Sequence, residues 1–157
     1  MTSVADYVGR TTDLMAFQGV SEEGEVLLSQ DLVTDTRGGL LCTGAQKMAQ
    51  QWLMEFLTEI GTVLYLPDKG CDFMSLVRQG QLRSTLDAQQ AFATANQQAQ
   101  RNMANDVKAS TPDDEILALV ELLDVAVDGD TLKLYVRLTS RAADAAPLIL
   151  PISVRTS

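Results

Sequence analysis

Residues 44–60 carry a helical pattern that runs for four turns without a break. Apolar side chains recur at spacings of three and four, which places all of them on one face of a helix. Thr43 and Gln46 stand where the partners of a capping box lie, and Gly61 follows at the position of a helix C-cap. We expect this helix to be the spine of the core, with a buried face made of Ala45, Met48, Ala49, Trp52, Leu53, Phe56, Leu57 and Ile60.

The segment 117–139 alternates apolar and polar residues on both sides of a central Asp-Gly-Asp turn. Asp-Gly between two alternating stretches is a strong signal for an antiparallel hairpin. A two-residue loop would set Asp124 opposite Lys133. A four-residue loop would instead pair Val125 with Leu134, and the sequence leaves both registers open. The alternation predicts one buried face, made of Leu123, Val125, Val127, Leu132, Leu134, Val136 and Leu138.

Two further helices are predicted between these elements. Residues 72–79 favour a brief helix ended by Gly80, and residues 84–108 contain no Gly or Pro. The long helix has a narrow apolar face of mostly small residues at heptad-like spacing. We expect that much of it is exposed or that it lies against a helix of a partner. Its stripe consists of Ala88, Phe92, Ala95, Ala99, Met103 and Val107.

Short extended segments complete the predicted fold. Residues 62–66 favour a short strand or an extended segment. Residues 148–154 favour an edge strand or a mobile arm, because Pro151 lacks the N–H that a central strand needs. Residues 14–17 and 25–28 indicate a modest hairpin or a pair of extended arms. The fold class is therefore α+β, with amphipathic helices packed on a small antiparallel sheet that includes a C-terminal β-hairpin. We expect one domain over 41–157, preceded by an N-terminal extension over 1–40.

Charge and composition exclude several kinds of partner. The chain carries 21 acidic against 12 basic residues, a formal charge of −9, and such a surface repels nucleic acid and anionic lipid. Residues 1–20 include Asp6, Arg10 and Asp13 and no apolar run, which argues against a signal peptide. Apolar runs elsewhere are far too short for a membrane span. We therefore expect no nucleic-acid partner and no membrane partner.

The chain contains no histidine, which removes the usual general base near neutral pH and the commonest zinc ligand. Carboxylates cluster at Glu22-Glu23-x-Glu25 and at Asp113-Asp114-Glu115, but adjacent loop residues point apart, so solvated loops are favoured over a glycosidase pair. Cys42 and Cys71 have no metal-binding motif around them, and two buried thiols are favoured over a disulfide. We expect no enzymatic activity, no cofactor and no metal.

Two short motifs follow the first helix: Leu57-Thr58-Glu59-Ile60-Gly61, and then Pro67-Asp68-Lys69-Gly70-Cys71. Their order resembles the baseplate wedge and sheath-initiator family of contractile phage tails, which has relatives in R-type pyocins and type VI secretion baseplates. The similarity covers residues 44–140. Family members commonly carry a Glu-Pro-Arg motif before the hairpin, where this chain has Asp113-Asp114-Glu115 after Pro112 and no arginine. Some relatives carry a lysozyme-like label, but no residue pattern here supports that activity.

The resemblance implies a structural baseplate protein that joins the baseplate to the first sheath ring, through strand addition between the hairpin and a sheath arm. Its partners would be the sheath protein and other wedge or hub proteins, in several copies within a symmetric assembly. It would reside in the host cytoplasm during assembly and in the virion tail afterwards. Another hub or tube-end adaptor and a small cytosolic protein-binding regulator stay open as alternatives. The expected partner-binding residues are Lys133, Tyr135, Arg137, Ile149, Ile152 and Glu115.

Overall fold

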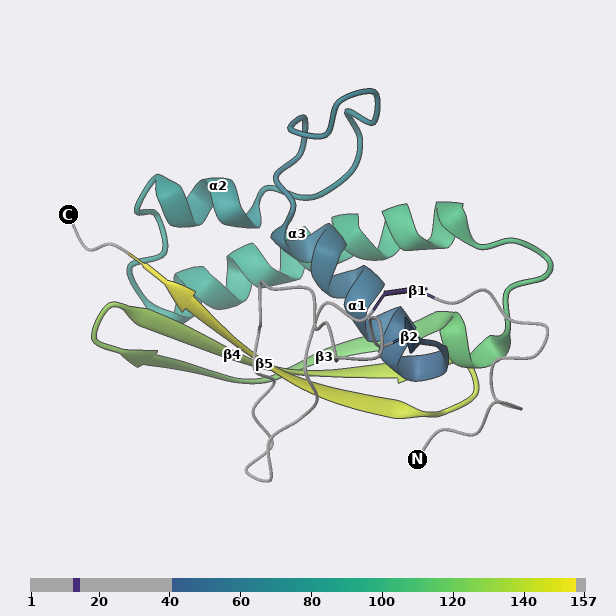
Figure 1. Ribbon diagram of the computed structural model, residues 1–157. Helices are drawn as coiled ribbons and strands as arrows, with labels where there is room; N and C mark the ends of the chain where they lie inside the picture. Colours follow the sequence, from purple (N-terminus) through teal and green to yellow (C-terminus); the bar gives the residue numbers. More distant parts are fainter. Residues whose placement is uncertain (1–12, 15–40, 155–157) are drawn as a thin grey trace, which may run out of the picture.

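The computed structural model describes residues 13–14 and 41–154, so most of the expected N-terminal arms lie outside the described residues. Helices pack on one face of an antiparallel sheet whose strand order is β3-β4-β5 (Figure 1). This confirms the predicted α+β class. The elements are β1 (Asp13–Leu14), β2 (Leu41–Cys42), α1 (Gly44–Leu57), α2 (Phe73–Arg78), α3 (Thr85–Asp106), the 3₁₀ turn η2 (Asp113–Glu115), β3 (Leu117–Asp128), β4 (Thr131–Ser140) and β5 (Ala145–Ser153).

Helix α1 is the centre of the core, as its periodicity predicts. Trp52 stacks on Phe56 with ring centroids 4.8 Å apart, and Phe56 in turn contacts Phe73 of α2 at 4.7 Å. The indole Nε1–H of Trp52 donates a hydrogen bond of 3.1 Å to Asn96 Oδ1 on α3, so the one polar atom of this side chain is paired. The residues of α1 that are fully buried are Met48, Trp52, Leu53 and Phe56.

The predicted C-terminal end of this helix is wrong by three residues. Helix α1 ends at Leu57, and Thr58 is extended, with its hydroxyl donating to Met54 O. Ile60, expected in the buried face, is exposed. The cause is a contact that is distant in sequence: the Ile60 N–H donates to Cys71 O, and the Cys71 N–H donates to Thr58 O. This bridge draws the chain out of the helix before Gly61.

The predicted strand over 62–66 is also wrong, because these residues form successive turns of a loop between α1 and α2. Helix α2 matches its prediction, including Gly80 just after its end. Helix α3 begins after Ser84, whose Oγ accepts a hydrogen bond from the Asp87 N–H. Its small-residue stripe packs against α1 and β3 within the same chain, so it needs no partner helix to cover it. The buried members of the stripe are Ala88, Phe92, Ala95 and Ala99.

The C-terminal hairpin is confirmed, and its register combines parts of both alternatives. A two-residue turn, Gly129–Asp130, joins the strands, yet Val125 pairs with Leu134. A β-bulge between Leu122 and Asp124 shifts the alternation of β3. As a result Leu123 is half-exposed, which corrects its predicted burial. Val127 is also half-exposed, although it lies opposite the buried Leu132.

Candidate functional site

The central position of β4 leaves β3 and β5 as the outer strands of the sheet in the described part of the chain. The Val154 N–H donates to Asp130 O at 2.7 Å, and the Ser140 N–H donates to Asp144 O at 2.9 Å. These bonds lie at opposite ends of the β4–β5 ladder, which pairs without a register shift. Because backbone groups alternate in direction along a strand, the even-numbered residues of β5 face β4. The odd-numbered residues of β5 therefore direct their backbone N–H and C=O groups outward.

The outer edge of β5 is interrupted by two prolines. Pro147 and Pro151 both belong to the outward-directed set, so two of its five backbone donors are absent. The remaining donors belong to Ala145, Ile149 and Ser153, which stand four residues apart. Proline at such positions is a common protection of a sheet edge against pairing with other chains. The prediction that Pro151 marks an edge strand is confirmed, and Pro147 extends the same protection.

The outer edge of β3 differs from the edge of β5. By the same alternation, the backbones of Val125 and Val127 are directed away from β4. The Val125 N–H is satisfied by its neighbour, Asp124 Oδ1, at 2.8 Å. Around these positions, β3 exposes about half of each of three large apolar side chains, which is unusual for one edge strand. These side chains belong to Leu119, Leu123 and Val127.

Four of the six predicted partner-binding residues share the outer face of the sheet. Lys133, Tyr135 and Arg137 lie on β4, on the face opposite the helices, because their neighbours on β4 are buried. Ile149 of β5 pairs with Tyr135 and is half-buried on the same face. Lys133 Nζ lies 3.9 Å from Asp128 Oδ2, a loose ion pair at the surface. Since β4 is central, these residues present side chains to a partner but no backbone edge.

The other two predicted residues are buried. Ile152 belongs to the inner row of β5 and packs in the core, where a partner cannot reach its side chain. Glu115 accepts hydrogen bonds from three groups at the start of α1: Lys47 Nζ at 2.7 Å, Thr43 Oγ1 at 2.8 Å and the Gly44 N–H at 3.3 Å. The reading of Asp113-Asp114-Glu115 as a solvated loop is therefore wrong for Glu115.

These contacts also replace the predicted capping box. The Thr43 hydroxyl donates to the Glu115 carboxylate instead of accepting a backbone N–H of its own helix. A carboxylate at this position suits the positive end of the helix dipole. Burial alone would raise the pKa of Glu115, but the hydrogen bonds from Lys47, Thr43 and Gly44 outweigh it and hold the pKa below its ordinary value of 4.5. The carboxylate is thus ionised at neutral pH and fastens η2 to α1.

A second polar cluster lies at the other end of α1. Lys69 pairs with Glu55 at 2.9 Å and with Asp106 at the end of α3. Asn102 Nδ2 donates to Glu55 Oε2 and to the backbone oxygens of Asp68 and Gly70, at 3.0–3.1 Å. The cluster therefore fastens the loop between α1 and α2 to α3.

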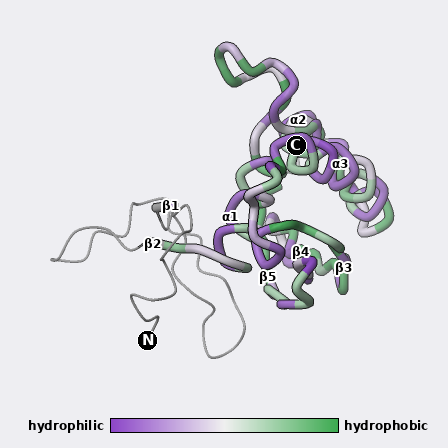
Figure 2. Tube along the Cα trace, turned by 90° about the vertical axis from the view of Figure 1, so that its right-hand side faces the viewer, coloured by the Kyte–Doolittle hydropathy of each residue, from purple (hydrophilic) through white to green (hydrophobic). Residues whose placement is uncertain are grey.

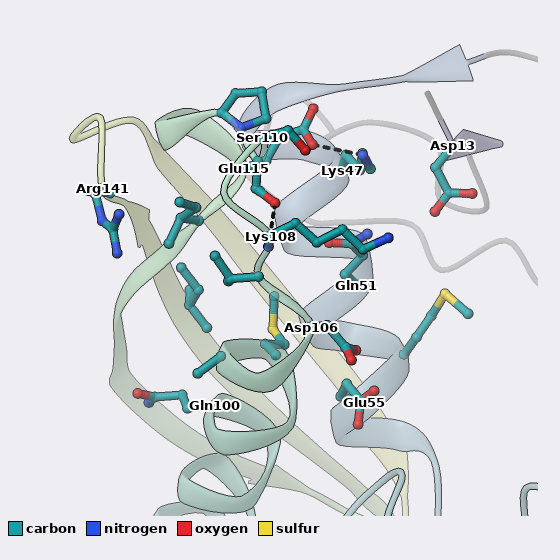
Figure 3. A pocket seen from close by; sticks show the side chains of 18 of the residues that line it. Asp13, Lys47, Gln51, Glu55, Gln100, Asp106, Lys108, Ser110, Glu115 and Arg141 are labelled. Carbon is teal, nitrogen blue, oxygen red and sulfur yellow. Dashed lines mark hydrogen bonds and ion pairs between the residues drawn. The ribbon is translucent and has the colours of Figure 1, made fainter. Parts of the chain in front are cut away.

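A cavity of about 760 Å³ lies between these two clusters, bordered by α1, the C-terminal half of α3 and the segment that leads to β3 (Figure 3). Glu115 and Lys47 stand at one end of it, and Glu55 and Asp106 stand together at the other. Both Lys47 and Lys69 are paired with carboxylates, so these lysines serve to hold elements together. Within the described residues no group of Asp, Glu or Cys is arranged to hold a metal ion.

The two cysteines are free and buried, as expected. Desolvation by burial raises the pKa of each thiol to about 11, so neither is a thiolate nucleophile at neutral pH. Cys71 donates its S–H to Phe56 O at 3.1 Å. Among the described residues no helix is both long and apolar enough to cross a bilayer.

Comparison of the chain with protein families, curated proteins and solved structures finds no match. The functional argument therefore rests on the geometry of the chain itself.

Proposed function

We propose that this protein is a structural component of a contractile tail baseplate, which initiates the sheath by accepting an arm of the sheath protein as an added strand. The observation that carries the proposal is the contrast between the two sheet edges. The β5 edge lacks two backbone donors, whereas the β3 edge is flanked by half-exposed Leu119, Leu123 and Val127. In this role the partners are sheath and other baseplate proteins, and the chain occurs in several copies within the tail.

Strand addition to β3 would use the outward-directed backbone of its second half. An arriving strand would form main-chain hydrogen bonds with the Val127 N–H and with the outward carbonyl oxygens of Val125 and Val127, and its side chains would cover exposed apolar residues next to the edge. Leu134 and Val136 of β4 stay committed to the core while this happens, because the arm adds at the edge of β3 and β4 keeps its central place in the sheet. Lys133, Tyr135 and Arg137 lie on β4, one strand further in, so their side chains border β3 on the outer face and do not form the edge itself.

A pair of proline variants tests which edge accepts the arm. Val127→Pro removes an outward N–H from β3, and Ser153→Pro removes one from β5. Val127→Thr keeps the N–H and the branched shape, so it serves as the matched control. Binding of each purified variant to purified sheath protein of the same tail is measured after circular dichroism has verified the fold. We expect Val127→Pro to weaken binding at least tenfold and the other two variants to bind within about twofold of the parent.

The reverse pattern would assign the arm to the β5 edge. If Val127→Pro and Ser153→Pro both bind sheath as the parent does while they remain folded, strand addition is the wrong mechanism. If the parent itself does not bind sheath protein, the baseplate function is wrong.

A further inference from the structure

The loop between α1 and α2 projects away from the rest of the molecule (Figures 1 and 2). Its tip, residues 61–67, contains no charged side chain. Three consecutive apolar residues there are exposed: Leu64 at 75%, Tyr65 at 89% and Leu66 at 52%. A contiguous apolar tip that stays this exposed in the described chain is typical of a binding element.

Internal hydrogen bonds give the tip one defined shape. The Gly61 N–H donates to Pro67 O at 3.1 Å, and the Leu66 N–H donates to Val63 O at 3.1 Å. Tyr65 has a φ of 68°, a left-handed conformation that is uncommon for a residue with a large side chain. Such backbone conformations persist only where the surroundings hold them, and they cluster at sites that bind.

The base of the loop is fastened to two helices. The Gly70 N–H donates to Glu55 Oε2 of α1, and Asn102 of α3 donates to the oxygens of Asp68 and Gly70. Lys69 adds its ion pairs with Glu55 and Asp106. A loop that is ordered before it binds loses little conformational entropy on binding, which favours affinity.

We infer that this loop is a second docking element, which inserts Leu64, Tyr65 and Leu66 into an apolar pocket with a basic rim on a neighbouring baseplate protein. The inference rests on the proposed function and supplies its baseplate-side contact. Figure 1 places the loop beyond the helices, on the side away from the sheet, so sheath and baseplate could be held at the same time.

The negative charge next to the tip indicates which kind of partner surface would complement it. The uncharged tip is followed by the exposed carboxylates of Asp68 and Asp72, and the chain carries a formal charge of −9. A rim of lysine or arginine around the pocket would complement these carboxylates. A second copy of the chain has the same sign of charge, and anionic lipid is repelled as well. Tyrosine is also among the residues that most often dominate protein–protein binding energy.

The test measures two affinities for each variant by calorimetry: one for the purified wedge protein of the same baseplate and one for purified sheath protein. The loop variants are Tyr65→Ser and the triple replacement of Leu64, Tyr65 and Leu66 by serine. Leu86→Ser on α3 is the matched control, because Leu86 is similarly exposed outside the loop. We expect Tyr65→Ser to weaken wedge binding at least tenfold and the triple variant to abolish it. Leu86→Ser should leave it unchanged, and all three variants should bind sheath as the parent does.

Other outcomes overturn the inference in distinguishable ways. A parent that does not bind sheath protein refutes the proposed function. A parent that binds sheath but not wedge protein refutes only the docking loop, as does a folded triple variant that binds wedge protein as tightly as the parent. Parent chains that self-associate through Tyr65 in sedimentation equilibrium would identify a second copy as the occupant. Flotation of the parent, but not of the triple variant, with vesicles of phosphatidylcholine and phosphatidylglycerol would identify a membrane. If the Tyr65 side chain is protected from solvent in the parent and loses this protection when residues 1–40 are deleted, the occupant of the loop is the chain's own N-terminal extension.

Discussion

Lys47 and Glu115 stand 68 positions apart in the sequence, yet their side chains form a 2.7 Å ion pair that is almost fully buried. Glu115 belongs to the short turn that leads into β3, and Lys47 belongs to the first turn of α1. The pair thus joins the helical layer to the strand that carries the proposed acceptor edge. Both charges are further removed from water than is usual for such groups, so the loss of either side chain should cost stability.

Stability should fall in acid through Glu115. Its folded-state pKa lies below 4.5, so the unfolded state binds a proton more readily than the folded state. The stabilisation it provides is therefore complete above the unfolded pKa and is lost as the pH falls through the folded pKa. We expect the free energy of unfolding to drop as the pH falls below about 4.5, and to drop less steeply in Glu115→Gln. Urea denaturation across this range measures both slopes, and equal slopes would contradict the assignment.

Removing one partner of the pair should be worse than removing both. Glu115→Gln removes the carboxylate that accepts hydrogen bonds from Lys47, Thr43 and Gly44, which should destabilise the fold by about 1.5–3 kcal/mol at neutral pH. The double variant Lys47→Met/Glu115→Leu replaces both charges by apolar groups of similar size and should recover most of that loss. Denaturant midpoints of the single and double variants give the comparison. A double variant that is less stable than Glu115→Gln would show that the polar pair is needed for folding.

Trp52→Ala should remove the largest side chain of the core. Its indole contacts Phe56 and Phe92 and donates a hydrogen bond to Asn96, so the replacement leaves both a void and an unpaired amide oxygen. The expected loss is about 3–5 kcal/mol. Since Trp52 is the only tryptophan, unfolding of this variant is followed by circular dichroism. An unchanged denaturant midpoint would contradict the placement of α1 in the core.

Gly70→Ala should disturb the base of the projecting loop more than Gly61→Ala disturbs its neck. A Cβ at Gly70 would lie 2.4 Å from Thr58 O, at a φ of 91°. Gly61 also has a positive φ of 80°, but a Cβ there meets nothing within 4 Å. Gly61→Ala therefore measures the backbone strain alone, about 1–2 kcal/mol, and Gly70→Ala adds a steric clash to it. Thermal melting of both variants shows which one loses more stability. A loss in Gly70→Ala no larger than that in Gly61→Ala would show that Gly70 can shift to relieve the clash.

Lys133→Ala and Arg137→Ala should weaken sheath binding by no more than about threefold each, because surface charges on a β-sheet face contribute little when the backbone supplies the main contacts. Neither change should alter stability by more than about 0.5 kcal/mol. The binding assay used for the proline variants provides the measurement. A tenfold loss from either replacement would show that side chains on the face of the sheet, and not its edge, recognise the arm.

Elements with a strong local period were predictable. The apolar face of α1, the length of α3 and the β3–β4 hairpin follow from patterns within a single segment. The end of α1 was not predictable in this way, because it depends on the hydrogen bond from the Ile60 N–H to Cys71 O, and Cys71 lies outside the helical segment. The bulge at Leu123 likewise depends on pairing across strands, and it moved a residue that alternation assigned to the core.

Some residues of the candidate site were also predictable from the local sequence pattern, and others were not. Lys133, Tyr135 and Arg137 were placed correctly on the outer face because alternate residues of a strand share a face. Ile149 and Ile152 are separated by three positions, so a regular strand cannot direct both outward, and Ile152 lies in the core. The exposed run at 64–66 lies in a segment whose composition favours a strand. Its position between Gly61 and Pro67 was the signal that favoured a loop.

The prolines of β5 limit how many other chains can pair with the edges of the sheet. A sheet that could pair equally well along both sides would let added strands continue from either one, and free copies could polymerise. Pro147 and Pro151 interrupt one side at regular intervals. Growth of the sheet is thereby confined to a single direction. Under the proposed function each copy would accept one arm, and the number of arms in the first ring would equal the number of copies that the baseplate holds.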